Sequence, residues 1–138
     1  MASPSTPLVM IVDDFEDALE MYRDYLVFSG LRVTTAANGE DAIAVAIRDQ
    51  PDVIFMDIRM PGMTGTEAMV ALRQEPRFNK VPIVALTAHA LHAEHAAALR
   101  AGFDEVISKP CLPDELVAAI KRLIAQRPGA ASPPSASA

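Results

Sequence analysis

Short apolar runs alternate with amphipathic stretches along the chain, and most of the runs end at a polar residue. The runs are Leu8–Val12, Leu31–Ala36, Val53–Met56, Val81–Leu86 and Glu105–Ser108. Continuous apolar runs of this length favour strands that are buried on both faces of a parallel sheet. The run Leu31–Ala36 is more polar and alternates, which is typical of an edge strand. The pattern therefore predicts five strands.

The stretches between these runs carry apolar residues at helical spacing. The first helix is expected to place four residues on one inward face, namely Phe15, Leu19, Tyr22 and Leu26, and Gly30 follows it as a helix stop. The other expected helices span residues 40–48, 66–74 and 90–101, and a last one begins at Pro113. Their apolar residues include Ile43, Ala46, Ile47, Ala68, Met69, Leu72, Leu91, Leu99, Leu116, Ile120, Leu123 and Ile124. Five β-α units predict an α/β fold with parallel strands and with helices on both faces of the sheet.

Composition and charge narrow the class of protein. The 138 residues are 51% hydrophobic and 22% charged, which is ordinary for one globular domain. The ends are rich in Pro, Ser and Ala, so we expect an extension over residues 1–6, a folded domain over 7–126, and a disordered tail or linker over 127–138. A single cysteine rules out an intramolecular disulfide and argues against a Cys-based zinc site.

The charge balance and the apolar runs also bear on partners. With 12 Lys+Arg against 18 Asp+Glu, the net charge is −6, which argues against a general nucleic-acid binder. No apolar run approaches the roughly 18 residues that cross a membrane, and the N-terminus has no secretory signal. We therefore expect a cytoplasmic protein without membrane or nucleic-acid partners.

Polar residues follow the predicted strands at the point where each strand ends. Asp13 and Asp14 follow the first strand, and the later strands end at Asp57, Thr87 and Lys109. Open parallel sheets bind ligands at the carboxyl ends of their strands, so we expect these five side chains to converge there. Three carboxylates in one place repel each other, and a hard divalent cation such as Mg²⁺ relieves that repulsion.

The lysine and the threonine suggest what else this site binds. An ammonium group suits a phosphoryl oxygen, and a hydroxyl can donate to one. The five residues therefore indicate a site for a phosphoryl group on or beside a carboxylate, and carboxylates can act as phosphoryl acceptors. We expect Asp57 to be the acceptor because it lies on the central strand, with Asp13 and Asp14 holding the metal ion.

Four motifs in this order carry a family resemblance. They are Asp13-Asp14, the segment from Asp57 to Gly65, Thr87-Ala88, and Lys109-Pro110. Together they resemble the receiver domain of bacterial two-component response regulators over about residues 7–126, and most of all the single-domain chemotaxis and cell-cycle regulators. The resemblance implies a flavodoxin-like sheet with strand order 2-1-3-4-5 and five helices.

The resemblance also implies a role for each motif residue. Asp57 would accept a phosphoryl group from a histidine kinase or a histidine phosphotransfer protein. Asp14 and Asp57 would ligate Mg²⁺ (or Mn²⁺) with the backbone carbonyl of Arg59, and Asp13 would act through a metal-bound water. Lys109 would pair with a phosphoryl oxygen, and the Lys109–Pro110 peptide bond is expected to be cis.

Other implied properties concern signalling. Thr87 would move toward the phosphoryl group and pull the loop after the fourth strand with it. The downstream protein would then bind the face made by the fourth helix, the fifth strand and the fifth helix, where Leu91 and Leu112 are candidate contacts. Such a domain is a phosphoacceptor that assists its own phosphorylation and dephosphorylation, and not an enzyme with a separate substrate.

Two positions depart from the family pattern. Val106 stands where the family usually has Tyr or Phe, so the coupled movement of an aromatic ring is not available here. Cys111 follows the Lys-Pro pair in place of a common apolar residue, and we interpret it as a small buried hydrophobe.

The remaining candidate residues have simpler interpretations. His89, His92 and His95 are spaced three apart, and a solvated helix face explains them better than a metal site. His89 and Arg59 flank the expected pocket and are hypothesised to tune the lifetime of the phosphorylated state. Met60 and Met63 are expected to fill gaps in a loop.

Several other classes are compatible with parts of the pattern. A flavodoxin would need a phosphate-binding loop in place of the acidic residues after the first strand, and a phosphatase of the haloacid dehalogenase type would need an Asp at the position of Arg59. A receiver domain of a hybrid histidine kinase and a degenerate, unphosphorylated interaction module both remain as alternatives.

Overall fold

The computed structural model describes residues 6–88 and 92–126. The expectations for residues 1–5 and 127–138, and those for His89, Ala90 and Leu91, lie outside these residues. The strands are β1 (Leu8–Val12), β2 (Arg32–Ala36), β3 (Val53–Asp57), β4 (Ile83–Thr87) and β5 (Glu105–Ser108). The helices are α1 (Glu16–Phe28), α2 (Gly39–Asp49), α3 (Gly65–Arg73), α4 (His92–Ala101) and α5 (Pro113–Gln126), with a short 3₁₀ helix at Pro76–Phe78.

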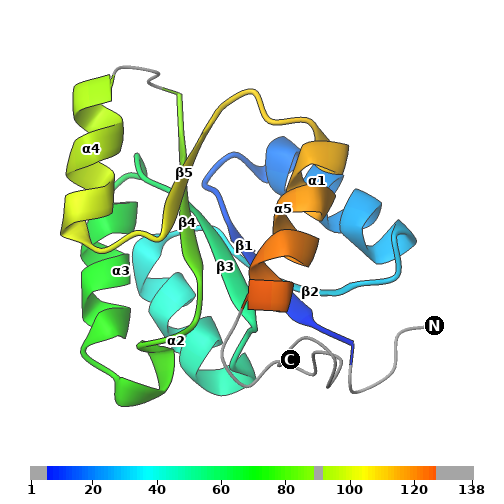
Figure 1. Ribbon diagram of the computed structural model, residues 1–138, viewed down its shortest axis with the longest axis horizontal. Helices are drawn as coiled ribbons and strands as arrows, with labels where there is room; N and C mark the ends of the chain where they lie inside the picture. Colours follow the sequence, from blue (N-terminus) through cyan, green and yellow to red (C-terminus); the bar gives the residue numbers. More distant parts are fainter. Residues whose placement is uncertain (1–5, 89–91, 127–138) are drawn as a thin grey trace, which may run out of the picture.

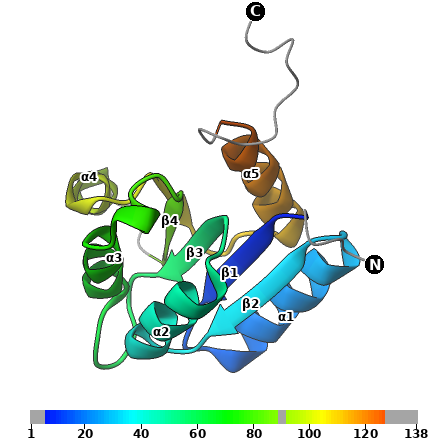
Figure 2. The ribbon, with the colours of Figure 1, turned by 90° about the horizontal axis from the view of Figure 1, so that it is seen from below.

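All five strands are parallel and form one sheet. Their order is β2-β1-β3-β4-β5, which confirms the predicted fold, and it reverses between β1 and β3. Helices α1 and α5 cover one face of the sheet, and α2, α3 and α4 cover the other (Figure 1, Figure 2). None of the helices in the described ranges is long and apolar enough to cross a membrane.

The side chains of the inner strands alternate between two apolar cores. Met10, Ile54 and Met56 enter the core under α2, α3 and α4. Ile11 and Phe55 enter the core under α1 and α5. Each of these side chains is fully buried, because β1 and β3 are covered by helices on both faces. The two cores hold the ends of these strands in fixed positions.

Local capping sets where the helices of the second face begin. Asn38 caps α2 through a hydrogen bond from the Asp41 N–H, as predicted, although the helix spans one residue more at each end than 40–48. Thr64 and Glu67 form a capping box, so α3 begins at Gly65 rather than at Thr66. A Cβ atom on Gly65 would overlap the carbonyl oxygen of Asp57. The glycine therefore lets α3 begin directly against the end of β3.

Two predictions about the first and last units need correction. Phe15 does not lie on the inward face of the first helix, because it is the extended N-cap residue of α1 and is 62% exposed. The edge strand β5 is half-buried along its whole length and not buried on both faces. Leu19, Tyr22 and Leu26 are buried as expected.

Candidate functional site

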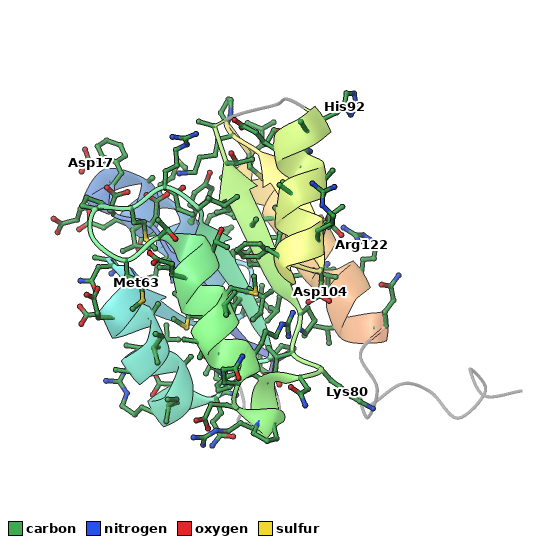
Figure 3. All side chains as sticks on the ribbon, turned by 90° about the vertical axis from the view of Figure 1, so that its left-hand side faces the viewer. Asp17, Met63, Lys80, His92, Asp104 and Arg122 are labelled. Atoms are coloured by element: carbon green, nitrogen blue, oxygen red, sulfur yellow. The ribbon has the colours of Figure 1, made fainter. Side chains whose placement is uncertain are left out.

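The five predicted rim residues lie at the carboxyl end of the sheet. The parallel register places Asp57 beside Leu86, and Thr87 beside Ser108, so successive strands end at the same level. Asp13, Asp57 and Thr87 are buried, whereas Asp14 is exposed. The starts of α1 and α4, marked by Asp17 and His92 in Figure 3, lie at this same end of the molecule, and Lys80 lies at the opposite end.

Lys109 connects two of the carboxylates. Its Nζ atom lies 2.7 Å from Oδ2 of Asp13 and 3.1 Å from Oδ2 of Asp57. Its backbone N–H donates to the Thr87 carbonyl over 2.7 Å, which fixes the start of the loop after β5. The Lys109–Pro110 peptide bond is cis. The structure therefore brings residues at the carboxyl ends of β1, β3, β4 and β5 to one edge of the sheet.

Backbone groups orient the two buried carboxylates. Oδ1 of Asp13 accepts a hydrogen bond of 2.9 Å from the Phe15 N–H, and Oδ1 of Asp57 accepts one of 3.2 Å from the Arg59 N–H. The second oxygen of each carboxylate points to Lys109. Each carboxylate is thus held in one orientation by a backbone donor on one side and an ammonium group on the other.

Burial and charge shift the pKa values in this site. Burial raises the pKa of Asp57, and the nearby Asp13 charge adds to the increase, while Lys109 acts in the opposite direction without cancelling it. Burial lowers the pKa of Lys109, but the hydrogen bond to Asp13 and the charges of Asp13 and Asp57 outweigh it, so the net shift is upward. Lys109 is therefore held as a cation, and added positive charge would favour the ionised form of Asp57.

The donor set fits a hard divalent cation. Oxygen atoms of Asp13, Asp14 and Asp57 lie within 4.8 Å of one another. The ammonium group of Lys109 pairs with Asp13 and Asp57, so the three carboxylates and this one cation carry a formal excess of two negative charges. Mg²⁺ binds through carboxylates and waters, so this cluster meets its preferences in both charge and donor type.

The other residues that the motifs single out lie outside the acidic cluster. The guanidinium group of Arg59 extends to α4, where Nη2 lies 3.9 Å from Oε1 of Glu94. Ala88 is exposed. Val106 is partly buried and packs against the core under α2, α3 and α4. His89 lies outside the described residues.

Cys111 and the two methionines agree with their structural interpretations. Cys111 is 4% exposed, and burial first, then the charges of Glu115 and Asp114, raise the pKa of its thiol. Met60 is buried, and Met63 packs against the same core beside Gly39. These residues fill space.

The histidines differ partly from the prediction. His92 is exposed, but His95 is half-buried, and its Nε2 lies 3.2 Å from Oγ of Ser108. Within the described ranges, the acidic group is the one cluster of three or more potential metal ligands, and neither histidine belongs to it. His95 therefore connects α4 to the end of β5, and is not simply part of a solvated face.

One polar contact beside the site was not predicted from the sequence. Tyr22 belongs to the buried stripe of α1, and its hydroxyl donates to the Cys111 carbonyl over 3.0 Å. The available signal was a tyrosine on the inward face of the first helix, because a buried phenol needs a hydrogen-bond acceptor.

Comparisons with known proteins agree with this geometry. The model of the response regulator receiver domain matches residues 9–121. The chain is 37% identical over 89% of its length to the transcriptional regulatory protein PrrA of Mycobacterium tuberculosis, and it spans about half, 52%, of that relative.

Solved structures give the same result. The chemotaxis protein CheY4 of Vibrio cholerae matches with a TM-score of 0.81 and 31% identity, over 86% of this chain and 98% of that one. The receiver domain of the sensor histidine kinase PA1611 from Pseudomonas aeruginosa, whose structure has a magnesium ion in the active site cleft, matches with a TM-score of 0.78 and 32% identity, over 86% and 97%. By sequence, fold and the residues at its strand ends, the chain belongs to the response regulator receiver domain family of two-component signalling.

Proposed function

We propose that Asp57 accepts a phosphoryl group from a phosphohistidine on a histidine kinase or a histidine phosphotransfer protein. The observation that carries this proposal is the position of Asp57 at the end of the central strand, in one pocket with Asp13, Asp14 and Lys109. A carboxylate oxygen of Asp57 bonds to phosphorus while the nitrogen–phosphorus bond of the donor breaks, and the imidazole nitrogen keeps the electron pair.

The acidic cluster is proposed to hold Mg²⁺, or Mn²⁺, through Asp13, Asp14 and Asp57, with the Arg59 carbonyl as a further ligand. The excess negative charge of the cluster supports this assignment, as does the magnesium ion in the related PA1611 receiver domain. When bound, the ion supplies positive charge that offsets the repulsion between an anionic donor and an anionic acceptor.

Lys109 and Thr87 are proposed to bind the transferred group. Lys109 Nζ already contacts the acceptor carboxylate, so the ammonium group is placed to pair with a phosphoryl oxygen. Thr87 is buried at the end of β4, where its hydroxyl can donate after a small movement. That movement would carry the segment after β4 and change the face made by α4, β5 and α5, to which a downstream protein binds. Val106 cannot add the movement of an aromatic ring.

Hydrolysis of the acyl phosphate is proposed to reset the protein. Arg59 and His89 would set its rate by controlling the access of water to the phosphoryl group. The ion pair between Arg59 and Glu94 gives Arg59 an alternative partner away from the pocket. Exchanging Arg59 and His89 together should change the dephosphorylation rate, followed by intact mass after the donor is removed; an unchanged rate would contradict this role.

The role of Asp57 as phosphoryl acceptor is tested by measuring the intact mass of the protein after incubation with acetyl phosphate, with and without Mg²⁺. We expect the wild-type protein to gain one phosphoryl group only with Mg²⁺, and Asp57→Asn to gain none. Asp17→Asn, an exposed residue in the first turn of α1, is the matched control and should react like the wild type. No gain by the wild type, together with no Mg²⁺ binding, would instead indicate an unphosphorylated interaction module.

The domain is proposed to act as a single-domain cytoplasmic regulator, with residues 7–126 as the receiver and 127–138 as a tail. Its near-complete coverage of the CheY4 chain supports this setting. The similarity to a kinase receiver domain equally favours a place within a hybrid histidine kinase. An immunoblot of the native protein distinguishes the two, because a hybrid kinase would be several times larger than 14.8 kDa.

A further inference from the structure

Tyr22 joins two segments that carry opposite sides of the acceptor site. It lies in the middle of α1, directly after the segment that supplies Asp13 and Asp14, and only 4% of the residue is exposed. Its hydroxyl donates over 3.0 Å to the carbonyl oxygen of Cys111, 89 positions away along the chain. Cys111 lies two residues after Lys109, in the loop between β5 and α5. One buried hydrogen bond thus connects the acidic segment to the lysine-bearing loop.

The backbone of this loop is hydrogen-bonded on both sides of Cys111. The Lys109 N–H donates to the Thr87 carbonyl at the loop's start, and the Leu112 N–H donates to the Glu115 side chain at the start of α5. Between these two points, the Tyr22 hydroxyl is the donor that the structure gives to the Cys111 carbonyl. Burial raises the pKa of Tyr22, so the hydroxyl keeps its proton and remains a donor across the neutral range.

We propose that Tyr22 is a positioning residue for phosphoryl transfer, which holds Lys109 at the right distance from the acidic cluster; this inference rests on the proposed function of Asp57. The hydroxyl does not touch the reacting atoms. It acts through the loop, because the separation of Lys109 Nζ from Asp57 Oδ2, 3.1 Å, depends on how the loop sits against α1. Small displacements of a charge-stabilising group reduce the rate strongly, since the interaction must be aligned in the transition state.

The chain offers a matched pair of substitutions for the test. It has two tyrosines, both on α1: Tyr22 is buried with a bonded hydroxyl, and Tyr25 is 38% exposed. Tyr22→Phe and Tyr25→Phe each remove one oxygen atom and leave the ring in place. The rate of phosphorylation by acetyl phosphate at saturating Mg²⁺ is measured by intact mass, well below the melting temperature, and the Kd for Mg²⁺ is measured by calorimetry.

We expect Tyr22→Phe to phosphorylate on the order of tenfold more slowly than the wild type, while Tyr25→Phe reacts at the wild-type rate. Mg²⁺ should bind Tyr22→Phe at least as tightly as the wild type, because the carboxylates remain and the competing ammonium group is held less firmly. A general loss of structure would weaken Mg²⁺ binding and phosphorylation together, and that result would overturn the proposal. So would a Tyr22→Phe rate within twofold of the wild type. If the wild-type protein itself is not phosphorylated, the proposed function fails first, which is a distinct outcome.

Discussion

The two ends of the sheet differ in how their charged side chains are balanced. At the amino end, the Arg73 guanidinium donates to the carbonyls of Phe78, Val81 and Gly102 and to the Asp104 carboxylate, over 2.6 to 3.1 Å. Oδ2 of Asp104 also accepts from the Ile83 N–H at 2.8 Å. At the carboxyl end, three carboxylates cluster, and Lys109 pairs with two of them. Balanced charge at the amino end stabilises the fold, whereas the excess of negative charge at the carboxyl end favours the binding of a cation.

Breaking the amino end should give the largest change in stability. Arg73→Met removes a mostly buried cation from three backbone carbonyls and one carboxylate, and we expect the free energy of unfolding to fall by about 3 kcal/mol. Urea unfolding followed by circular dichroism measures this change. Arg100→Met, in the exposed last turn of α4, is the control and should change stability by no more than about 0.5 kcal/mol. Equal losses in the two variants would contradict the comparison.

Adding Mg²⁺ should stabilise the protein through the carboxyl end alone. At a free Mg²⁺ concentration ten times the Kd, we expect the free energy of unfolding to rise by about 1.4 kcal/mol, because the ion binds the folded state. The increase should persist in Arg100→Met and be strongly reduced in Asp57→Asn. Potassium chloride at the same ionic strength controls for screening; an equal effect of that salt would argue against a specific site.

Relieving the repulsion at the carboxyl end should stabilise the fold while weakening function. Asp14 is the exposed member of the acidic cluster, so Asp14→Asn removes one like charge without leaving a buried gap. Without metal, we expect the free energy of unfolding to rise by about 1 kcal/mol, and Mg²⁺ to bind at least about tenfold more weakly. Asp17→Asn, an exposed carboxylate three residues further along the chain in the first turn of α1, provides the comparison. A loss of stability in Asp14→Asn would show that the cluster is not under repulsion.

The smallest expected effect on stability comes from Asp49, whose pKa is shifted in the opposite direction to that of Asp57. The hydrogen bond from Arg48 is the largest cause that lowers the pKa of Asp49, to about 2, and Thr34 contributes a second. The contribution of Asp49 to the free energy of unfolding is therefore present above its unfolded pKa near 3.8, and it is lost as the pH falls toward 2. The pKa of Asp57 is raised, so its contribution to the free energy of unfolding is present at low pH and is lost as the pH rises through that pKa.

Asp49→Asn should therefore reduce the free energy of unfolding at pH 7 by no more than about 0.5 kcal/mol, because solvent screens this surface pair. The difference from the wild type should shrink below pH 4 in urea titrations repeated across pH. A difference that grows in acid would mean that Asp49 is not the charged partner of Arg48.

The parts of the structure that sequence predicts well are those set by local pattern. Asp57 and Thr87 could be assigned to one rim because each ends an apolar run, and parallel strands end together. The strand order came from the family resemblance, which spacing alone does not supply. Asn38 was recognised as a cap because that interaction spans three residues.

The parts that sequence missed depend on contacts between distant segments. Arg73 bonds to residues 5, 8, 29 and 31 positions away, and three of its four partners are backbone carbonyls that no residue type reveals. The Tyr22 hydroxyl likewise has a backbone partner. The position of Phe15 was predicted wrongly because it depends on where α1 begins. A shift of one residue in the helix start decides whether the ring enters the core or faces solvent.

Gly62 lies in the loop between β3 and α3, and Gly65 is the first residue of α3. The structure gives the two glycines different tolerances to substitution. Gly62 has a φ of 75° with open space around it, so its restriction comes from backbone angle, which asparagine can adopt. Gly65 has no room for any side chain against the Asp57 carbonyl. In a saturation library selected only for folding, position 62 should accept a few residues and position 65 none. A strictly retained glycine at position 65 would therefore report how closely α3 approaches the end of β3, and not a role in the chemistry of the site.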